Sequence, residues 1–276
     1  MSVRQALSVD FQGPRHLLTL YFIIRLWASY LVTHRCRAER THWQLMLPQA
    51  TSRAPLYRFT SRFVALGERV ASLLEDSDAL WRQDDFERAY ELFQNFAKII
   101  ADIEDFNSTL CSFAELASPG PHIKTSAQCS PDSLTATILQ GYGLACLIHS
   151  AVAAWNIART FGTRPNGEAL NVPIAQDRLQ SLCEDACRTI SELAVERYGL
   201  MTGAPILFFI DSAWIGYAAL EEYGGRNISE VRSWFMDIGA HMAGTGYRPL
   251  REPWMKTWSF AGGLESEHAM NDSLSL

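Results

Sequence analysis

Apolar residues recur at helical spacing in the first strongly patterned part of the chain. From position 56 onward, successive apolar residues are separated by 3, 4, 3, 4 and 3 positions, which places them on one face of a helix. These residues are Leu56, Phe59, Phe63, Leu66, Val70 and Leu73. Pro55 stands just before them, where a proline in the first turn is tolerated. The pattern predicts an amphipathic helix that begins at Pro55.

Two capping boxes mark the starts of further helices. Asp84 is followed three positions later by Glu87, and Asn227 is followed three positions later by Glu230. The first box opens a predicted helix whose inward face contains Phe86, Tyr90, Phe93, Ala97, Ile100 and Leu110. The second opens the last helix that the pattern predicts.

Loops rich in proline and glycine separate the remaining elements. Residues 118–132 hold three prolines and a glycine among small polar residues, which predicts a loop. Ser130 and Pro131 then suit the cap and first position of a helix that runs to about Phe161. A second loop follows at 162–173. Three more helices are predicted, over about 174–197, 205–222 and 228–243.

The predicted fold class is all-α. No alternating run bounded by turn signals indicates a strand, and the apolar run at 205–210 continues too far for a typical strand. We expect an antiparallel array of about seven or eight helices. The expected organisation is an N-terminal helical segment over 1–54, a main helical domain over 55–258 and a polar, flexible tail over 259–276.

Two apolar segments raise the question of a membrane span. Residues 204–220 contain a single charge, Asp211, and residues 17–32 are interrupted by Arg25. Both segments are shorter than the roughly 20 apolar residues that a spanning helix requires. A charge near the middle of each makes insertion costly. We therefore interpret both as buried helices and expect no membrane association.

Composition narrows the class of protein further. The chain of 276 residues has a formal net charge of −6, with 48% hydrophobic and 20% charged residues. A surface with this acidic balance is poorly suited to neutralising phosphates, so direct nucleic-acid binding is not expected. The first residues lack the apolar core of a secretory signal. An intracellular protein is the expectation.

The six cysteines do not form a metal-binding pattern. They are scattered along the chain, and no Cys-x-x-Cys pair occurs. Cys183 and Cys187 would share a helix face, but no other cysteine or histidine lies near them in sequence to complete a ligand set. We expect reduced, mostly buried thiols, no metal and no cofactor.

The order of features over 177–258 resembles a known family. The sequence reads "DRLQSLCEDACRTISELAVERYGLMTGAPILFFIDSAWIGYAALEEYG", followed by "SEVRSWFMDIGAHMAGTGYRP". It is similar to the C-terminal part of the regulatory region of fungal binuclear zinc-cluster transcription factors. Upstream, "FAKIIADIEDFNSTLCSFAELAS" and "LTATILQGYGLACLIHSAVAAW" are similar to the middle of that region. The matching positions of the first part are Ala186, Cys187, Arg188, Thr189, Ile190, Pro205, Trp234, Gly244 and Gly246.

The resemblance covers about residues 55–258 and has one clear departure. Members of the family that bind DNA carry six clustered cysteines, which hold two zinc ions, near the N-terminus. Here Cys36 is the only cysteine in the first hundred residues. The resemblance therefore implies a regulatory region without its own DNA reader.

One short motif has an enzymatic interpretation. The segment "DDFER" at 84–88 is similar to the aspartate-rich metal motif of class I terpene cyclases. Such a site needs carboxylates one turn apart to hold magnesium against diphosphate. Arg88 occupies the place of the final acid, and no second metal motif follows. The helix cap at Asp84 explains the same residues more simply.

The candidate site residues lie on two apolar helices. Tyr142, His149 and Asp211 are the candidate catalytic groups if the protein is an enzyme, and Trp155 and Trp214 join them as candidate ligand-binding residues. The alternative for the histidine is a core residue hydrogen-bonded to a neighbour. A buried carboxylate must be paired or neutralised. For Asp211 we expect a structural partner among Arg188, Arg159 and His149.

The aromatic residues near the C-terminus have two interpretations. Trp254 and Trp258, four positions apart, share a helix face, and Phe260 follows them. Closing the core is the usual role of such large aromatic side chains. The alternative is a docking surface for a coregulator.

Together these observations favour a transcription-regulator-like protein over an enzyme. We expect it to control a metabolic or secondary-metabolite gene set through protein contacts with a coregulator or a DNA-binding transcription factor, with a small apolar effector as a further partner. The expected location is the nucleus, with the cytoplasm as the alternative. The alternative functions are a non-metal cyclase or isomerase with an apolar pocket, and a non-catalytic interaction module.

Overall fold

A computed structural model describes residues 55–80, 85–117, 131–162, 170–195 and 200–244. Over these residues it contains six helices and no strand, which confirms the all-α class. The helices are α4 (Pro55–Leu80), α5 (Phe86–Ala117), α6 (Pro131–Phe161), α7 (Gln176–Val195), α8 (Leu200–Gly224) and α9 (Ser229–Gly244). The predictions for 1–54 and 259–276, Arg25, Cys36, Trp254, Trp258 and Phe260 lie outside the described residues.

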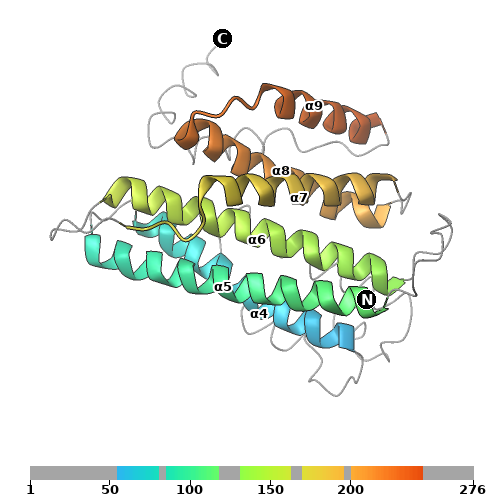
Figure 1. Ribbon diagram of the computed structural model, residues 1–276, viewed down its shortest axis with the longest axis horizontal. Helices are drawn as coiled ribbons and strands as arrows, with labels where there is room; N and C mark the ends of the chain where they lie inside the picture. The colour runs from blue at the N-terminus through green and yellow to red at the C-terminus, as the bar shows by residue number, and fades with distance from the viewer. Residues whose placement is uncertain (1–54, 81–84, 118–130, 163–169, 196–199, 245–276) are drawn as a thin grey trace, which may run out of the picture.

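Helix α6 is the central element of the array. It packs against α4, α5, α7 and α8, while α9 lies against α8. Figure 1 shows α4 and α5 on one side of α6, and α7, α8 and α9 on the other. Between Gly141 and Trp155 every residue of α6 is buried, so the helix has no solvent-facing stripe over four turns. A helix that is apolar on all sides belongs inside a protein or inside a membrane.

Paired contacts give the direction of each helix. Arg62 and Arg69 of α4 pair with Asp105 and Asp102 of α5, both at 2.6 Å, so α4 and α5 are antiparallel. The contacts of α7 with α8 likewise run in opposite directions. In contrast, α6 and α8 run parallel, and α7 connects them. The residue numbers of their contacting pairs increase in the same direction along both helices. The pairs are Tyr142 with Phe208, His149 with Ser212, and Asn156 with Tyr223.

Helix α8 contains the apolar segment 204–220. From Phe208 to Ala213 each of its residues is buried, and Phe209 and Ile210 are completely covered. Among the described residues, one helical stretch, Ala136–Phe161 of α6, is long and apolar enough to cross a membrane, and 89% of its apolar window is buried inside the molecule. Core helices of soluble proteins meet the same criterion. The burial of residues 208–213 agrees with our interpretation of segment 204–220 as a core helix.

The starts of α5, α8 and α9 can be compared with the positions that the sequence predicts. Asp84 lies outside the described residues, and the carboxylate that caps α5 belongs to Asp85, whose Oδ1 accepts the N–H of Arg88 at 3.1 Å. Helix α8 begins at Leu200 instead of near Pro205. Only one backbone bond is lost at a proline this close to the helix start. The side chain of Asn227 caps α9, because its Oδ1 accepts the N–H of Ser229 at 2.9 Å, but the carbonyl that accepts the first helical bond belongs to Ile228, one position after the predicted cap.

The C-terminal end of α8 is closed by a glycine turn. Gly225 has a φ of 61°, a left-handed conformation that glycine adopts without steric cost. Its N–H donates to the carbonyl of Glu221, and the N–H of Arg226 donates to the carbonyl of Leu220. These bonds satisfy carbonyl groups that the end of a helix leaves open. The turn directs the chain into α9.

Gly216 lies where α6, α7 and α8 come closest together. A Cβ atom added there would lie 2.4 Å from Cys183 Sγ and 3.0 Å from Ile148 Cγ2. The missing side chain therefore permits the close approach of the three helices. In the middle of a helix glycine is unfavourable by about 1 kcal/mol relative to alanine, so packing has to offset that cost.

Replacing Gly216 by Ala is expected to destabilise the protein by about 1–2 kcal/mol, because overpacking of a filled core outweighs the gain in helix propensity. Urea unfolding measures the change. The same substitution should cost less in a Cys183→Ala background, where the clashing sulfur is absent. If Gly216→Ala stabilises the protein in both backgrounds, the three helices are not in close contact at this point.

Candidate functional site

His149 and Ser212 form a hydrogen-bonded pair between α6 and α8. His149 Nε2 lies 3.2 Å from Ser212 Oγ, and both residues are buried. Ser212 donates its single hydroxyl proton to the carbonyl of Phe208 at 2.8 Å, so Oγ accepts the other bond from the Nε2–H of His149. A hydrolytic serine–histidine pair needs the opposite polarity, with Nε2 as the acceptor. The geometry is that of a structural bond in the core.

Aromatic rings surround this pair. The ring of Phe208 stacks on His149 with an interplanar angle of 7°, and it stacks on Tyr142 with a centroid separation of 5.2 Å. Phe209 meets Tyr142 edge to face, at 4.9 Å and 76°. Tyr142 is 1% exposed. The structure thus brings the predicted residues Tyr142 and His149 together, as part of the packed layer between α6 and α8.

Asp211 is buried next to this layer without the expected partner. Asp211 is 6% exposed, and burial raises the pKa of its carboxyl group from 3.8 to about 7. The expectation that Arg188, Arg159 or His149 pairs with it is wrong. Arg188 pairs with Asp185 at 2.8 Å, Arg159 with Glu222 at 2.6 Å, and His149 bonds to Ser212. Loss of solvation therefore determines the pKa of Asp211, because it disfavours the charged carboxylate.

The two predicted tryptophans lie apart from this cluster. Trp214, on α8, meets Phe235 of α9 edge to face at 5.4 Å, and the guanidinium of Arg232 lies 5.8 Å from the centre of its ring. Trp155 lies near the C-terminal end of α6, and its Nε1–H donates to the carbonyl of Ile174 at 2.7 Å. The five candidate residues are therefore distributed over three places in the fold.

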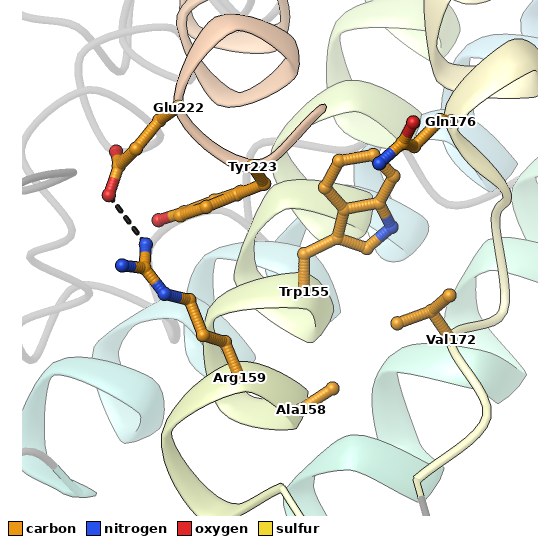
Figure 2. Close-up of a pocket in the computed structure, with 7 residues that line it drawn as sticks. All are labelled: Trp155, Ala158, Arg159, Val172, Gln176, Glu222 and Tyr223. Atoms are coloured by element: carbon orange, nitrogen blue, oxygen red, sulfur yellow. Dashed lines mark hydrogen bonds and ion pairs between the residues drawn. The ribbon is translucent and has the colours of Figure 1, made fainter. Parts of the chain in front are cut away.

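A pocket of about 490 Å³ opens beside Trp155. It lies where the C-terminal ends of the parallel helices α6 and α8 meet the segment that leads into α7, and Figure 2 shows its lining side chains. These side chains are Trp155, Ala158, Arg159, Val172, Gln176, Glu222 and Tyr223. Of the predicted site residues, Trp155 lines this pocket, whereas Tyr142, His149, Asp211 and Trp214 do not. Its volume falls within the range of about 300–1,000 Å³ that is typical of small-molecule sites.

The polar groups around the pocket are largely engaged with one another. Arg159 Nη1 bonds to Glu222 Oε1 at 2.6 Å, and the guanidinium lies 4.7 Å from the centre of the Tyr223 ring. The hydroxyl of Tyr223 donates to Asn156 Oδ1. Its pKa is raised, first by burial and then by the negative charge of Glu222. The hydrogen bond to Glu222 also raises the pKa of Arg159.

Sequence reasoning missed most of this pocket. Arg159 follows Trp155 by one turn, and Glu222 and Tyr223 end the apolar run of α8, so each has a recognisable position within its own helix. The missing information is that α6 and α8 are parallel. Only parallel packing brings the C-terminal ends of both helices to the same place. No local pattern in the chain encodes that choice.

Three of the cysteines in the described part of the chain have the properties of packed thiols. Burial raises the pKa of Cys146 and of Cys183 far above the ordinary value, and it raises that of Cys187 to about 12. Thiols that are so hard to ionise are poor nucleophiles and poor metal ligands. Within the described ranges, no three histidine, cysteine or acidic side chains are grouped closely enough to hold a metal ion.

Searches against family models, curated proteins and solved structures find no match to this chain.

Proposed function

We propose that this protein is a transcription-regulator-like helical domain that acts through protein contacts. The resemblance to the regulatory region of fungal zinc-cluster factors motivates the proposal. The net charge of −6 supports it, because an acidic chain is better suited to protein partners than to a nucleic-acid backbone. On this proposal it works in the nucleus, on a metabolic or secondary-metabolite gene set.

The proposal depends on one observation: the polar groups of the core and the pocket are hydrogen-bonded or paired with other groups of the protein. The Ser212 proton is directed at a backbone carbonyl, and His149 donates to the serine, so neither is positioned as a nucleophile and its base. The accessible Arg159 and Glu222 neutralise each other. A domain built in this way suits binding more than turnover.

Tethering the chain to a promoter tests the proposal. We expect the full chain, fused to an unrelated DNA-binding domain in yeast nuclei, to change the output of a reporter gene several-fold relative to that DNA-binding domain alone. The matched control is the same fusion with Phe209→Ala, which removes a core ring and should abolish the effect. An unchanged reporter with a folded, nuclear fusion protein would contradict a regulatory role.

A further inference from the structure

We propose that the pocket beside Trp155 is a binding site for a small, uncharged, planar aromatic molecule with one hydrogen-bonding group at its edge. The inference goes beyond the proposed function and does not depend on it, because the geometry of the pocket requires no protein partner. It rests on three properties of the lining: its aromatic walls, its balanced charge and an amide at its edge.

The walls of the pocket offer ring faces and apolar groups. The rings of Trp155 and Tyr223 lie 6.2 Å apart at an angle of 56°, and each ring has its polar atom engaged within the protein. Val172 is 41% exposed, although it is a large apolar side chain. In Figure 2, Tyr223 and Val172 lie on opposite sides of the Trp155 ring, and Ala158 lies below it. A flat aromatic molecule in the pocket would cover Val172 and contact the exposed parts of the lining rings.

The charges of the lining cancel. Arg159 is bonded to Glu222, and the guanidinium also rests on the Tyr223 ring. An anion would have to compete with Glu222 for the guanidinium, and a cation would have to compete with Arg159 for the carboxylate. The side chains of Arg159 and Glu222 are 60% and 35% exposed, so breaking the pair has only a small cost, which a charged ligand would still have to meet. An uncharged molecule avoids this cost.

Gln176 supplies the polar contact. The amide lies beside Gly224, where an added Cβ would come within 3.2 Å of its Oε1 and 3.3 Å of its Nε2. Packing against the glycine positions the amide at the edge of the pocket, as Figure 2 shows. An amide both donates and accepts, so it can pair with a hydroxyl or a ring N–H. This matches the edge of a phenol, a naphthol or an indole.

Fluorine NMR titration of the purified full chain tests the proposal with 6-fluoro-2-naphthol as the neutral probe and 6-fluoro-2-naphthoate as the anionic probe. We expect the naphthol to bind, and the naphthoate to bind a few-fold more weakly, because it has to compete with Glu222 for the guanidinium. Equal or tighter binding of the naphthoate would overturn the charge argument. A folded protein that does not bind the naphthol up to its solubility limit would overturn the site.

Substitutions locate the binding. Ala158→Leu fills the pocket and is expected to abolish naphthol binding, whereas Ala101→Leu, at an exposed position on α5, makes the same change elsewhere and should leave binding intact. Val172→Asp places a charge at an exposed position of the rim, so it should weaken binding without threatening the fold. Unchanged binding in both pocket variants would place the naphthol elsewhere and overturn the proposal.

Tyr223 separates a ligand contact from a structural role. Tyr223→Phe keeps the ring and removes the bond to Asn156, so it should retain binding. Tyr223→Leu removes the ring and should weaken binding about tenfold. Equal loss in the two variants would mean that the tyrosine acts through its hydroxyl, and the stacking argument would fail. The reporter experiment does not depend on this pocket, so the two proposals fail independently.

Discussion

Replacing Asp211 by Asn is expected to stabilise the protein at pH 8 and to have much less effect at pH 4. Burial raises the pKa of Asp211 from 3.8 to about 7. Each pKa unit corresponds to about 1.4 kcal/mol, so the stability difference between variant and parent should grow by roughly 3–4 kcal/mol between these pH values. The asparagine side chain is nearly the same size as that of aspartate, but it carries no titrating group.

The direction of this pH dependence follows from burial, which favours the protonated form of Asp211 in the folded state. Between pH 4 and pH 7 the folded protein retains the Asp211 proton that the unfolded chain releases, so raising the pH favours unfolding. The stability that Asp211 retains at low pH is therefore lost as the pH rises through this window, and above about pH 7 the loss levels off. The Asp211→Asn variant does not undergo that loss.

Urea unfolding of both proteins at a series of pH values measures the effect. The matched control is Asp237→Asn, which removes a carboxylate of the same type from an exposed position on α9. Its stability difference from the parent should stay small at every pH, because surface substitutions usually change stability by less than about 0.5 kcal/mol. A constant difference for Asp211→Asn across the range would show that the carboxyl is hydrated or paired.

The second large effect is expected at Phe209. This ring is completely buried between α6 and α8, and it meets Tyr142 edge to face. Phe209→Ala should therefore lower the free energy of unfolding by about 3–5 kcal/mol, which is the cost of a large cavity in a packed core. Denaturant unfolding in detergent-free buffer measures it.

Met236 provides the control for Phe209. It is a large apolar residue on the neighbouring helix α9 and is 71% exposed. Met236→Ala should change stability by less than about 0.5 kcal/mol. Similar effects of the two substitutions would mean that the α8 segment does not lie in a core, and the account of segment 204–220 would have to be abandoned.

The local elements were largely predictable, because helix signals are local. Pro131 and Phe161 bound α6 as the sequence indicated, and Asn227 caps α9. The start of α8 was misplaced, because Pro205 looks like a first-turn residue although the helix begins at Leu200. The helical period identifies the buried face of a helix, but it does not determine how many residues the helix has before a proline near its start.

The arrangement of side chains between helices was harder to predict. Arg159 was expected near Asp211 and instead lies on Glu222, because charged partners are selected by helix direction and register. Gly141 and Gly216 each leave room for a side chain that is more than 30 positions away in the sequence. Of the pocket, the sequence indicated Trp155 alone. Contacts between distant segments leave no pattern within a single sequence.

The fold separates a sealed core from an accessible pocket. Tyr142, His149 and Ser212 hold α6 and α8 together, whereas Trp155, Arg159 and Tyr223 line the open end of the same two helices. Helices α6 and α8 are continuous through both regions, so the core and the pocket are built on the same two elements.

The contact between Gly141 of α6 and Phe209 of α8 allows the most direct test of the central claim, that segment 204–220 is a core helix packed on α6. A Cβ added at Gly141 would lie 2.5 Å from Cε2 and Cζ of Phe209, two atoms that leucine lacks. Gly141→Ala should therefore destabilise the parent by about 1–2 kcal/mol, and in a Phe209→Leu background it should be neutral or stabilising by up to about 1 kcal/mol. A double-mutant cycle in urea unfolding measures the difference. The account predicts this change of effect, and an identical effect of Gly141→Ala in both backgrounds would contradict it.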